Sequence, residues 1–316
     1  MQPEIDPLDT KARFMKYCVG RGVIGPWAFL DISAHDFERV KKANRDLFVL
    51  LGIEQKFEMM IDNYLEYEQS LLSLTLGHMV AHDLSWAPFQ DAVFLVNRRL
   101  ANLLTVSRLY NDQVRNDIST IYGECAKTTA KLREAFSVQY DRLFGYRVME
   151  AIRNSLQHKL LPIKRLEYTA GWEDSGNTQM LHYRTTAKVN MEDLRADKHF
   201  KRSVLRQLED CGKDAPDITP FVRQYVEGLS CVQSEIRAVT NRDVNIWKTA
   251  VEEMIRRYSA VCGEDVKIAV MYRLDDEERT DEEITLFLEG IDHLEFWRRK
   301  PLPTYLSQAY LSNVGA

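Results

Sequence analysis

The fold class is decided by a long stretch without proline, FQDAVFLVNRRLANLLTVSRLYNDQVRNDISTIYG, which covers residues 89–123. Apolar residues recur along it at spacings of three and four, the period of one face of an α-helix. Ser85-Trp86-Ala87-Pro88 comes directly before it and offers a capping serine and an early proline, and Gly123 ends it. The stretch therefore predicts one long amphipathic helix.

The same spacing recurs on both sides of this stretch. It predicts further helices over residues 36–52, 55–82, 126–158, 200–209, 220–239, 243–262 and 281–297. Gly52 marks an expected break between the first two, and Pro216 and Pro220 punctuate the chain before residues 220–239. Residues 1–34 are rich in glycine and are expected to be irregular. Helices with short connections predict an antiparallel bundle.

A change of pattern follows residue 160. Residues 163–169 and 180–189 are rich in β-branched and aromatic side chains and flank a turn-forming segment, which predicts a β-hairpin. Residues 266–273 predict a third strand. We therefore expect a mainly α protein, an antiparallel helical bundle with a small β-hairpin insertion. The expected division is a helical bundle over 1–160 and a hairpin with a C-terminal helical part over 161–316, and the two could pack as one domain.

The amino-acid composition excludes some classes of protein. The 316 residues are 45% hydrophobic, which is enough for a substantial core. The five cysteines form no CxxC pair and are odd in number, so reduced thiols and a cytoplasmic protein are expected. The N-terminal stretch MQPEIDPLDTKARF lacks signal-peptide character, and no apolar run is long enough to span a bilayer. A formal net charge of -5 argues against a protein that coats nucleic acid.

Sequence motifs for metals and cofactors are weak, and we expect neither. The segment HMVAH, residues 78–82, lacks the glutamate of a zinc-binding HExxH motif, and no glycine-rich phosphate loop can be read. The acidic residues 275–278 are expected in a solvated loop, and those at 281–283 in the first turn of the last helix. Residues 297–300, Trp-Arg-Arg-Lys, fit the C-terminus of that helix.

A polar cluster near residue 155 carries the best indication of chemistry. In a helix, Arg153 and Gln157 share one face, and Asn154 and His158 share the neighbouring face. The apolar stripe of the same helix, residues 144, 148, 152 and 156, points elsewhere and can pack. Histidine can move a proton near neutral pH, and arginine binds phosphate oxygens through its planar fork. These residues favour metal-independent RNA cleavage by the ribose 2′-hydroxyl.

The segment IRNSLQHKLLPI, residues 152–163, resembles the motif of the HEPN superfamily, in which arginine is followed by a polar residue, three further residues and histidine. Residues 97–112 also look like the long helix that precedes this motif. The resemblance covers about a dozen residues closely, residues 50–160 loosely, and nothing beyond the hairpin. By chance, an Arg-Asn pair with His at this spacing is expected about 0.02 times in such a chain.

The resemblance implies a HEPN-like endoribonuclease of the toxin or antiviral kind, with Arg153 and His158 as the catalytic pair and Asn154 as the supporting polar residue. It also implies a homodimer and a possible antitoxin or regulatory partner. Spacing favours the homodimer independently, because Arg153 and His158 diverge by about 140° around a helix. A two-fold axis would place Arg153 of one subunit near His158 of the other.

RNA contacts are expected along the basic segment 142–165. Weak candidates for these contacts are Arg147, Gln157, Lys159, Lys164 and Arg165. Plainer alternatives stay open. The basic segment also fits a solvated helix face, Arg153 could pair with Glu150 or a backbone carbonyl, and His158 could occupy a helix C-terminus where its charge is favourable. The chain could then be a non-catalytic HEPN-fold protein that binds RNA or a partner protein.

Overall fold

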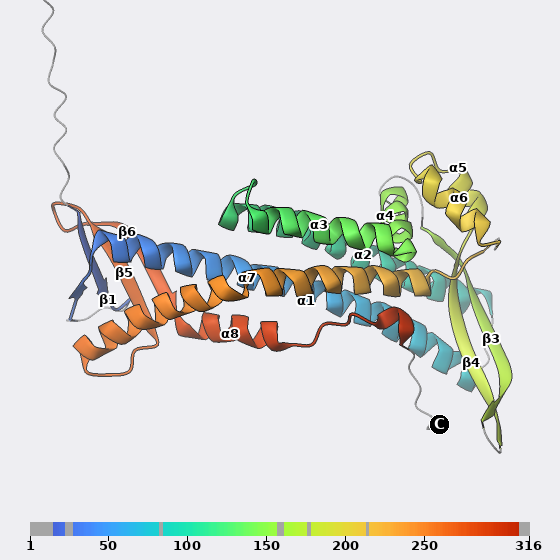
Figure 1. Cartoon of the computed structure of the whole chain (residues 1–316). Coiled ribbons are helices and arrows are strands. Elements are labelled where there is room, and N and C mark those ends of the chain that lie inside the picture. Colours follow the sequence, from blue (N-terminus) through green and yellow to red (C-terminus); the bar gives the residue numbers. More distant parts are fainter. Residues whose placement is uncertain are drawn as a thin grey trace, which may run out of the picture. The chain divides into compact units, whose positions relative to one another are not determined.

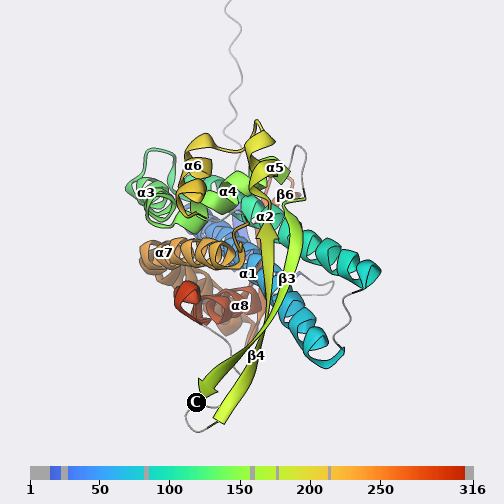
Figure 2. The ribbon, with the colours of Figure 1, turned by 90° about the vertical axis from the view of Figure 1, so that its right-hand side faces the viewer.

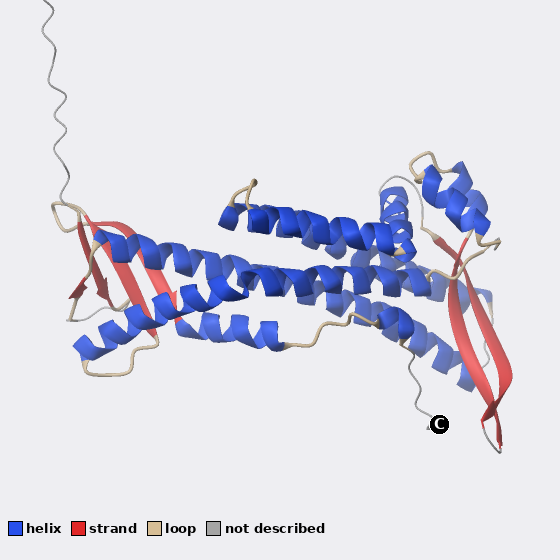
Figure 3. Cartoon of the chain, viewed as in Figure 1, coloured by secondary structure: helices blue, strands red, loops and turns tan. Residues whose placement is uncertain are grey.

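A computed structural model describes residues 15–22, 28–81, 85–156, 161–175, 178–212 and 215–309. Most of these residues are helical, and the strands form two small antiparallel sheets (Figure 3). The predicted fold class, mainly α with a β-hairpin, is confirmed. Within the described ranges, no helix has the length and apolar character needed to cross a membrane.

The chain divides into two compact units, each built from segments distant in sequence. Unit 1 comprises residues 1–51 and 240–299, and unit 2 comprises residues 52–239 and 300–316. Helices α1 (Ala34–Ala81) and α7 (Thr219–Cys262) contribute residues to both units. Residue 160 lies outside the described residues, so the domain boundary expected there stays a prediction.

Unit 1 contains a sheet with the strand order β2-β1-β5-β6. The strands are β1 (Lys16–Gly20), β2 (Leu30–Asp31), β5 (Ile268–Leu274) and β6 (Thr280–Phe287). The start of α1 packs against this sheet, because the buried Phe37 ring lies 5.1 Å from the Tyr17 ring and Asn44 donates a hydrogen bond to the Thr285 carbonyl. Helix α8 (Leu288–Arg299) follows β6 directly.

Two expectations fail in unit 1. The region 1–34 contains strands β1 and β2 where irregular structure was expected, and the helix predicted over 281–297 begins only at Leu288. Residues 281–287 belong to β6, where Ile284 and Leu286 are less exposed than their neighbours. This alternation has the period of a strand, and pairing with β5 satisfies the backbone. The acidic residues 281–283 therefore lie on a strand, whereas Arg298 and Arg299 do occupy the last turn of α8.

Unit 2 is a helical bundle with a hairpin (Figures 1 and 2). Besides the parts of α1 and α7, its elements are α2 (Trp86–Tyr122), α3 (Lys127–Arg142), α4 (Phe144–Leu156), β3 (Ile163–Ser175), β4 (Thr178–Val189), α5 (Met191–Ala196), α6 (Arg202–Asp210) and the 3-10 turn η1 (Leu306–Gln308). The predicted helix over 89–123 and the predicted hairpin are both present, and the hairpin is longer than expected.

Three predicted helix boundaries are wrong. Helix α1 continues through Gly52, because packing on each side outweighs the ~1 kcal/mol helix cost of a glycine. Helix α7 continues through residues 240–242, where Asn241 and Arg242 are exposed and the buried Thr240 accepts a hydrogen bond from Arg298. In contrast, the helix predicted over 126–158 is split, since Leu143 adopts an extended conformation between α3 and α4.

Helices α1 and α7 are joined by a buried ion pair within unit 2. The Arg237 guanidinium donates to both carboxylate oxygens of Glu54, at 2.7 Å for the shortest contact, and the Glu54 side chain is 1% exposed. Arg237 also donates to the Lys300 carbonyl at 2.7 Å. Tyr110 of α2 donates to Gln233 of α7 at 2.8 Å, so α7 makes buried polar contacts with both α1 and α2.

The position of α4 is set by a close approach to α7. A Cβ atom at Gly145 would lie 2.7 Å from the Cα of Phe221, and one at Gly228 would lie 2.7 Å from the Tyr146 ring. The Gly145 N–H donates to the Gln224 side chain at 2.7 Å. Only glycine lets the two backbones come this near, so these residues fix how α4 presents its last turns.

Candidate functional site

The last turns of α4 hold the predicted arginine in a fixed place. Nη2 of Arg153 donates to Oδ1 of Asn154 at 2.6 Å and lies 3.4 Å from Oε2 of Glu150. The Arg153 side chain is 11% exposed and the Glu150 side chain is 18% exposed. The two catalytic candidates on α4 are therefore in contact with each other, and the Arg153–Glu150 pair left open by the sequence is present.

Glu150 is held in turn by α7. The hydroxyl of Tyr225 donates to Oε1 of Glu150 at 2.8 Å. Burial, followed by the negative charge of Glu150, raises the pKa of Tyr225 well above its usual value, so the phenol stays protonated and keeps donating. A chain of contacts thus runs from Tyr225 through Glu150 to Arg153, and it orients the guanidinium from the core outward.

Two buried polar atoms near the end of α4 have no hydrogen-bond partner among the described residues. They are Nε of Arg153 and Oγ of Ser155. Buried polar groups are paired in the great majority of cases, so an unpaired N–H on an oriented guanidinium is a feature that a bound ligand or a catalytic role would explain.

The remaining predicted residues divide into two groups. Gln157, His158 and Lys159 lie outside the described residues. Arg147 donates to the carbonyls of Tyr140 and Asp141 at 2.9 and 2.7 Å, so it caps the C-terminal end of α3. On β3, Lys164 lies 3.9 Å from Asp193, and Arg165 is 68% exposed. Of the described candidates for RNA contact, Arg165 is the most accessible.

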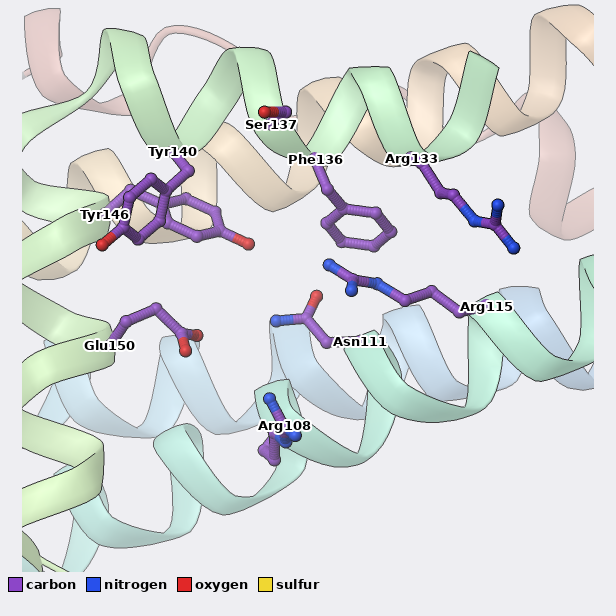
Figure 4. Close-up of a pocket in the computed structure, with 9 residues that line it drawn as sticks. All are labelled: Arg108, Asn111, Arg115, Arg133, Phe136, Ser137, Tyr140, Tyr146 and Glu150. Atoms are coloured by element: carbon purple, nitrogen blue, oxygen red, sulfur yellow. The ribbon is translucent and has the colours of Figure 1, made fainter. Parts of the chain in front are cut away.

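A pocket of about 330 Å³ lies between α2, α3 and α4 and shares Glu150 with the cluster just described (Figure 4). We call it the arginine pocket. Its lining comprises Arg108, Asn111 and Arg115 of α2, Arg133, Phe136, Ser137 and Tyr140 of α3, and Tyr146 and Glu150 of α4. Spacings of three, four and seven residues place each set on one face of its helix.

The charges in this pocket are predominantly positive. Arg108 pairs with the exposed Asp112 at 2.5 Å, and the Arg115 guanidinium lies 4.5 Å from the centre of the Phe136 ring. Within the ranges that the structure describes, Arg115 and Arg133 form no ion pair with a carboxylate. Glu150 is the acidic residue of the lining, and Arg153 offsets its charge.

The inner wall of the pocket is polar and buried. Asn111 is 5% exposed, and its Oδ1 has no hydrogen-bond partner in the described part of the chain. Burial and then the charge of Glu150 raise the pKa of Tyr146, while a hydrogen bond with the Asn111 side chain lowers it in part. The Asn111 side chain therefore contacts Tyr146, whereas its buried Oδ1 has no hydrogen-bond partner among the described residues.

Sequence reasoning did not identify the arginine pocket. The sequence indicates residues 97–112 only as a helix before the motif, although Arg108, Asn111 and Arg115 share one face of α2. A polar stripe along the edge of the apolar face was the available signal. It is weak, because most such stripes are solvated surface.

Comparison with protein-family models, curated proteins and solved structures finds no match. In the described ranges, no group of three or more His, Cys, Asp or Glu residues could hold a metal ion. His82 of the HMVAH segment lies outside those ranges. Asp275, from the acidic run, accepts the N–H groups of Glu277 and Arg279 and so stabilises a turn. The five cysteines are not in disulfides.

Proposed function

We propose that unit 2 acts as a HEPN-like, metal-independent endoribonuclease. The observation that carries the proposal is the end of α4, where Arg153 is oriented by Glu150 and Asn154 while its buried Nε has no partner among the described residues. An arginine held in this way is prepared to donate hydrogen bonds to a phosphate oxygen without reorganising. Nearby guanidinium groups of the arginine pocket add positive potential for an RNA backbone.

In the proposed reaction, His158 removes the proton from a ribose 2′-hydroxyl as general base. The oxygen attacks the adjacent phosphorus, the bond to the 5′-oxygen breaks, and a cyclic 2′,3′-phosphate and a 5′-hydroxyl end result. Arg153 stabilises the charge that develops on the phosphate, and Asn154 keeps the guanidinium in place. The proton removed from the 2′-hydroxyl can be returned to the departing 5′-oxygen.

A homodimer completes the proposed site, with Arg153 of one copy near His158 of the other. Much of the apolar face of α2 is used inside unit 2, but Phe94 and Leu109 are exposed and could contribute to a two-fold contact. Mixing Arg153→Ala with His158→Ala subunits tests this arrangement. Composite sites recover part of the cleavage activity, whereas a site contained in one chain recovers none.

Purified protein with single-stranded RNA in EDTA tests the cleavage. Wild-type protein is expected to produce cyclic-phosphate ends, and His158→Ala and Asn154→Ala are expected to lose this product while retaining the wild-type melting temperature. His35→Ala, at an exposed position on α1, is the matched control and should cleave normally. RNA with 2′-O-methyl groups should resist cleavage. Equal cleavage by wild type and His158→Ala would reject the proposal.

A second function is favoured by one observation. Arg153 is already paired with Glu150 and largely buried, which also suits a structural role in a non-catalytic protein that binds RNA or a partner. If wild-type protein binds RNA but leaves it intact, the result would support the non-catalytic function. For the toxin or antiviral form of the proposal, expression of wild type is expected to slow growth of a host cell, and co-expression of an antitoxin-type partner should relieve it.

A further inference from the structure

The arginine pocket has two chemically different ends. Figure 4 shows Arg133 at one end, the Arg115 guanidinium next along the pocket beneath the Phe136 ring, and Tyr146 and Glu150 toward the other end. The first end offers guanidinium donors, which suit an anion. The second offers oxygen acceptors, which suit hydroxyl or amino groups. A ligand that satisfies both ends carries a negative group and, some distance away, hydrogen-bond donors.

Arg115 is preorganised at the cationic end. Its guanidinium stacks over the Phe136 ring at 4.5 Å, so the face of the group is covered by the aromatic ring while the N–H donors around its edge stay accessible. Arg133 comes from α3 and forms no ion pair in the described part of the protein. Two planar forks from facing helices match the oxygens of a phosphate, which guanidinium groups bind through paired donors.

Asn111 is the acceptor that indicates a missing ligand. It is buried to 5% exposure, its amide contacts Tyr146, and its Oδ1 lacks a partner among the described residues. In Figure 4 this oxygen points toward the space between α2 and α3. Such an acceptor is costly when left unpaired, and a donor on a ligand would satisfy it.

The walls and size of the pocket indicate the rest of the ligand. Phe136, Tyr140 and Tyr146 supply aromatic surface on two sides. A volume of about 330 Å³ is at the lower end of the ~300–1,000 Å³ that small-molecule sites occupy. Aromatic walls between a phosphate-binding end and a hydrogen-bond acceptor suit a flat heterocyclic ring on a phosphorylated sugar.

We propose that the arginine pocket binds a nucleoside phosphate, with the phosphate on Arg115 and Arg133 and a donor of the sugar or base on Oδ1 of Asn111. Arg108 can add to the phosphate contact, because its present partner is the exposed Asp112, and exposed pairs are weak. This binding goes beyond the proposed cleavage and does not depend on it. The same chemistry is carried by a free nucleotide and by one nucleotide of an RNA strand.

Binding to the full chain is measured by titration calorimetry with five probes: the 5′-monophosphates of adenosine and guanosine, inorganic phosphate, unphosphorylated adenosine, and a short 2′-O-methyl RNA that cannot be cleaved. The variants are Arg133→Met, Arg115→Met and Asn111→Leu. Arg98→Met, an exposed arginine of α2 outside the pocket, is the matched control. His158→Ala separates this binding from catalysis and is expected to bind nucleotide as wild type does.

At least one monophosphate is expected to bind more tightly than inorganic phosphate or adenosine alone. Arg133→Met and Arg115→Met should each weaken it about tenfold or more, and Arg98→Met should leave it within about twofold. Arg133 is exposed and makes no ion pair within the described residues, so its variant remains informative even if Arg115→Met lowers stability. Asn111→Leu should weaken binding of the monophosphate and leave any binding of inorganic phosphate unchanged.

The sources of the nucleotide are distinguished by the RNA probe. If the 2′-O-methyl strand binds more tightly than the free monophosphates and loses binding in the pocket variants, the pocket is a subsite for an RNA strand. If the free monophosphate binds more tightly, the pocket is a small-molecule site. Both outcomes support the proposal. No binding of any nucleotide at millimolar concentration, inorganic phosphate binding as tightly as the nucleotides, or equal binding by Arg133→Met and wild type would overturn it.

Discussion

Replacement of Arg153 by methionine separates what this residue does for the fold from what it does for RNA. Methionine keeps much of the volume but removes the guanidinium, so Glu150 loses its ion-pair partner at 3.4 Å and retains the hydrogen bond from Tyr225. The pair lies between the extremes of a surface and a fully buried ion pair, with side chains 11% and 18% exposed. Losing one partner should therefore cost about 1–3 kcal/mol.

A second effect of the substitution opposes this loss of stability. Methionine also removes the buried Nε–H that has no partner among the described residues, which returns about 1 kcal/mol. The net destabilisation by Arg153→Met is then about 0–2 kcal/mol, or a melting temperature lower by at most about 8 °C for a unit of this size. Glu150→Gln keeps an acceptor for Tyr225 but loses the charge, so it should have a smaller effect.

A double-mutant cycle of these two changes measures their coupling. Chemical denaturation of wild type, both single variants and the double variant should give a coupling energy of about 1 kcal/mol. RNA cleavage is measured on the same four proteins well below their melting temperatures. Arg153→Met should abolish cleavage although most of the protein is folded, and Glu150→Gln should retain part of it. A coupling energy near zero would refute the idea that Glu150 orients Arg153.

Three further changes test what stabilises each unit internally. Gly145→Ala places a methyl group against the backbone of α7 and should cost about 1–3 kcal/mol, seen as a lower denaturation midpoint. Arg237→Met leaves Glu54 buried without its partner and should cost about 3–5 kcal/mol, whereas adding Glu54→Leu should restore much of the loss. Burial raises the pKa of Asp36, but hydrogen bonds from Arg257 and its other partners bring the pKa in the folded protein below 3.8. Unit 1 should therefore lose stability as the pH falls from the pKa of Asp36 in the unfolded protein through its pKa in the folded protein. Circular dichroism follows this loss. Asp36→Asn should remove that part of the acid sensitivity.

The extent to which the fold follows from the sequence depends on the range of the interactions involved. Helix α2 was predictable from residues 89–123, since its apolar face and both of its end signals are local. The continuity of α1 through Gly52 was not, because that glycine is tolerated only where the flanking residues are packed, and Ile53 is buried by partners elsewhere in the chain. Strand β6 was not predicted, because the apolar residues after residue 281 fit either a helix or a strand. Pairing with β5, a distant contact, decides in favour of the strand.

The candidate site shows the same division more sharply. Arg153 and Asn154 could be singled out because they are adjacent on one helix end, and the structure places them in contact at 2.6 Å. Spacing along one helix could also suggest Glu150, but nothing local indicates that Tyr225 of α7 would hold it. The polar residues of the arginine pocket come from three helices, and each helix taken alone presents an ordinary solvated stripe. It is the close approach of α4 to α7 at Gly145, rather than any motif, that brings Glu150 to the side of the arginines on α2 and α3. Sequence can therefore locate a chemical group on this chain, but the environment that would give the group a function arises only when distant segments pack.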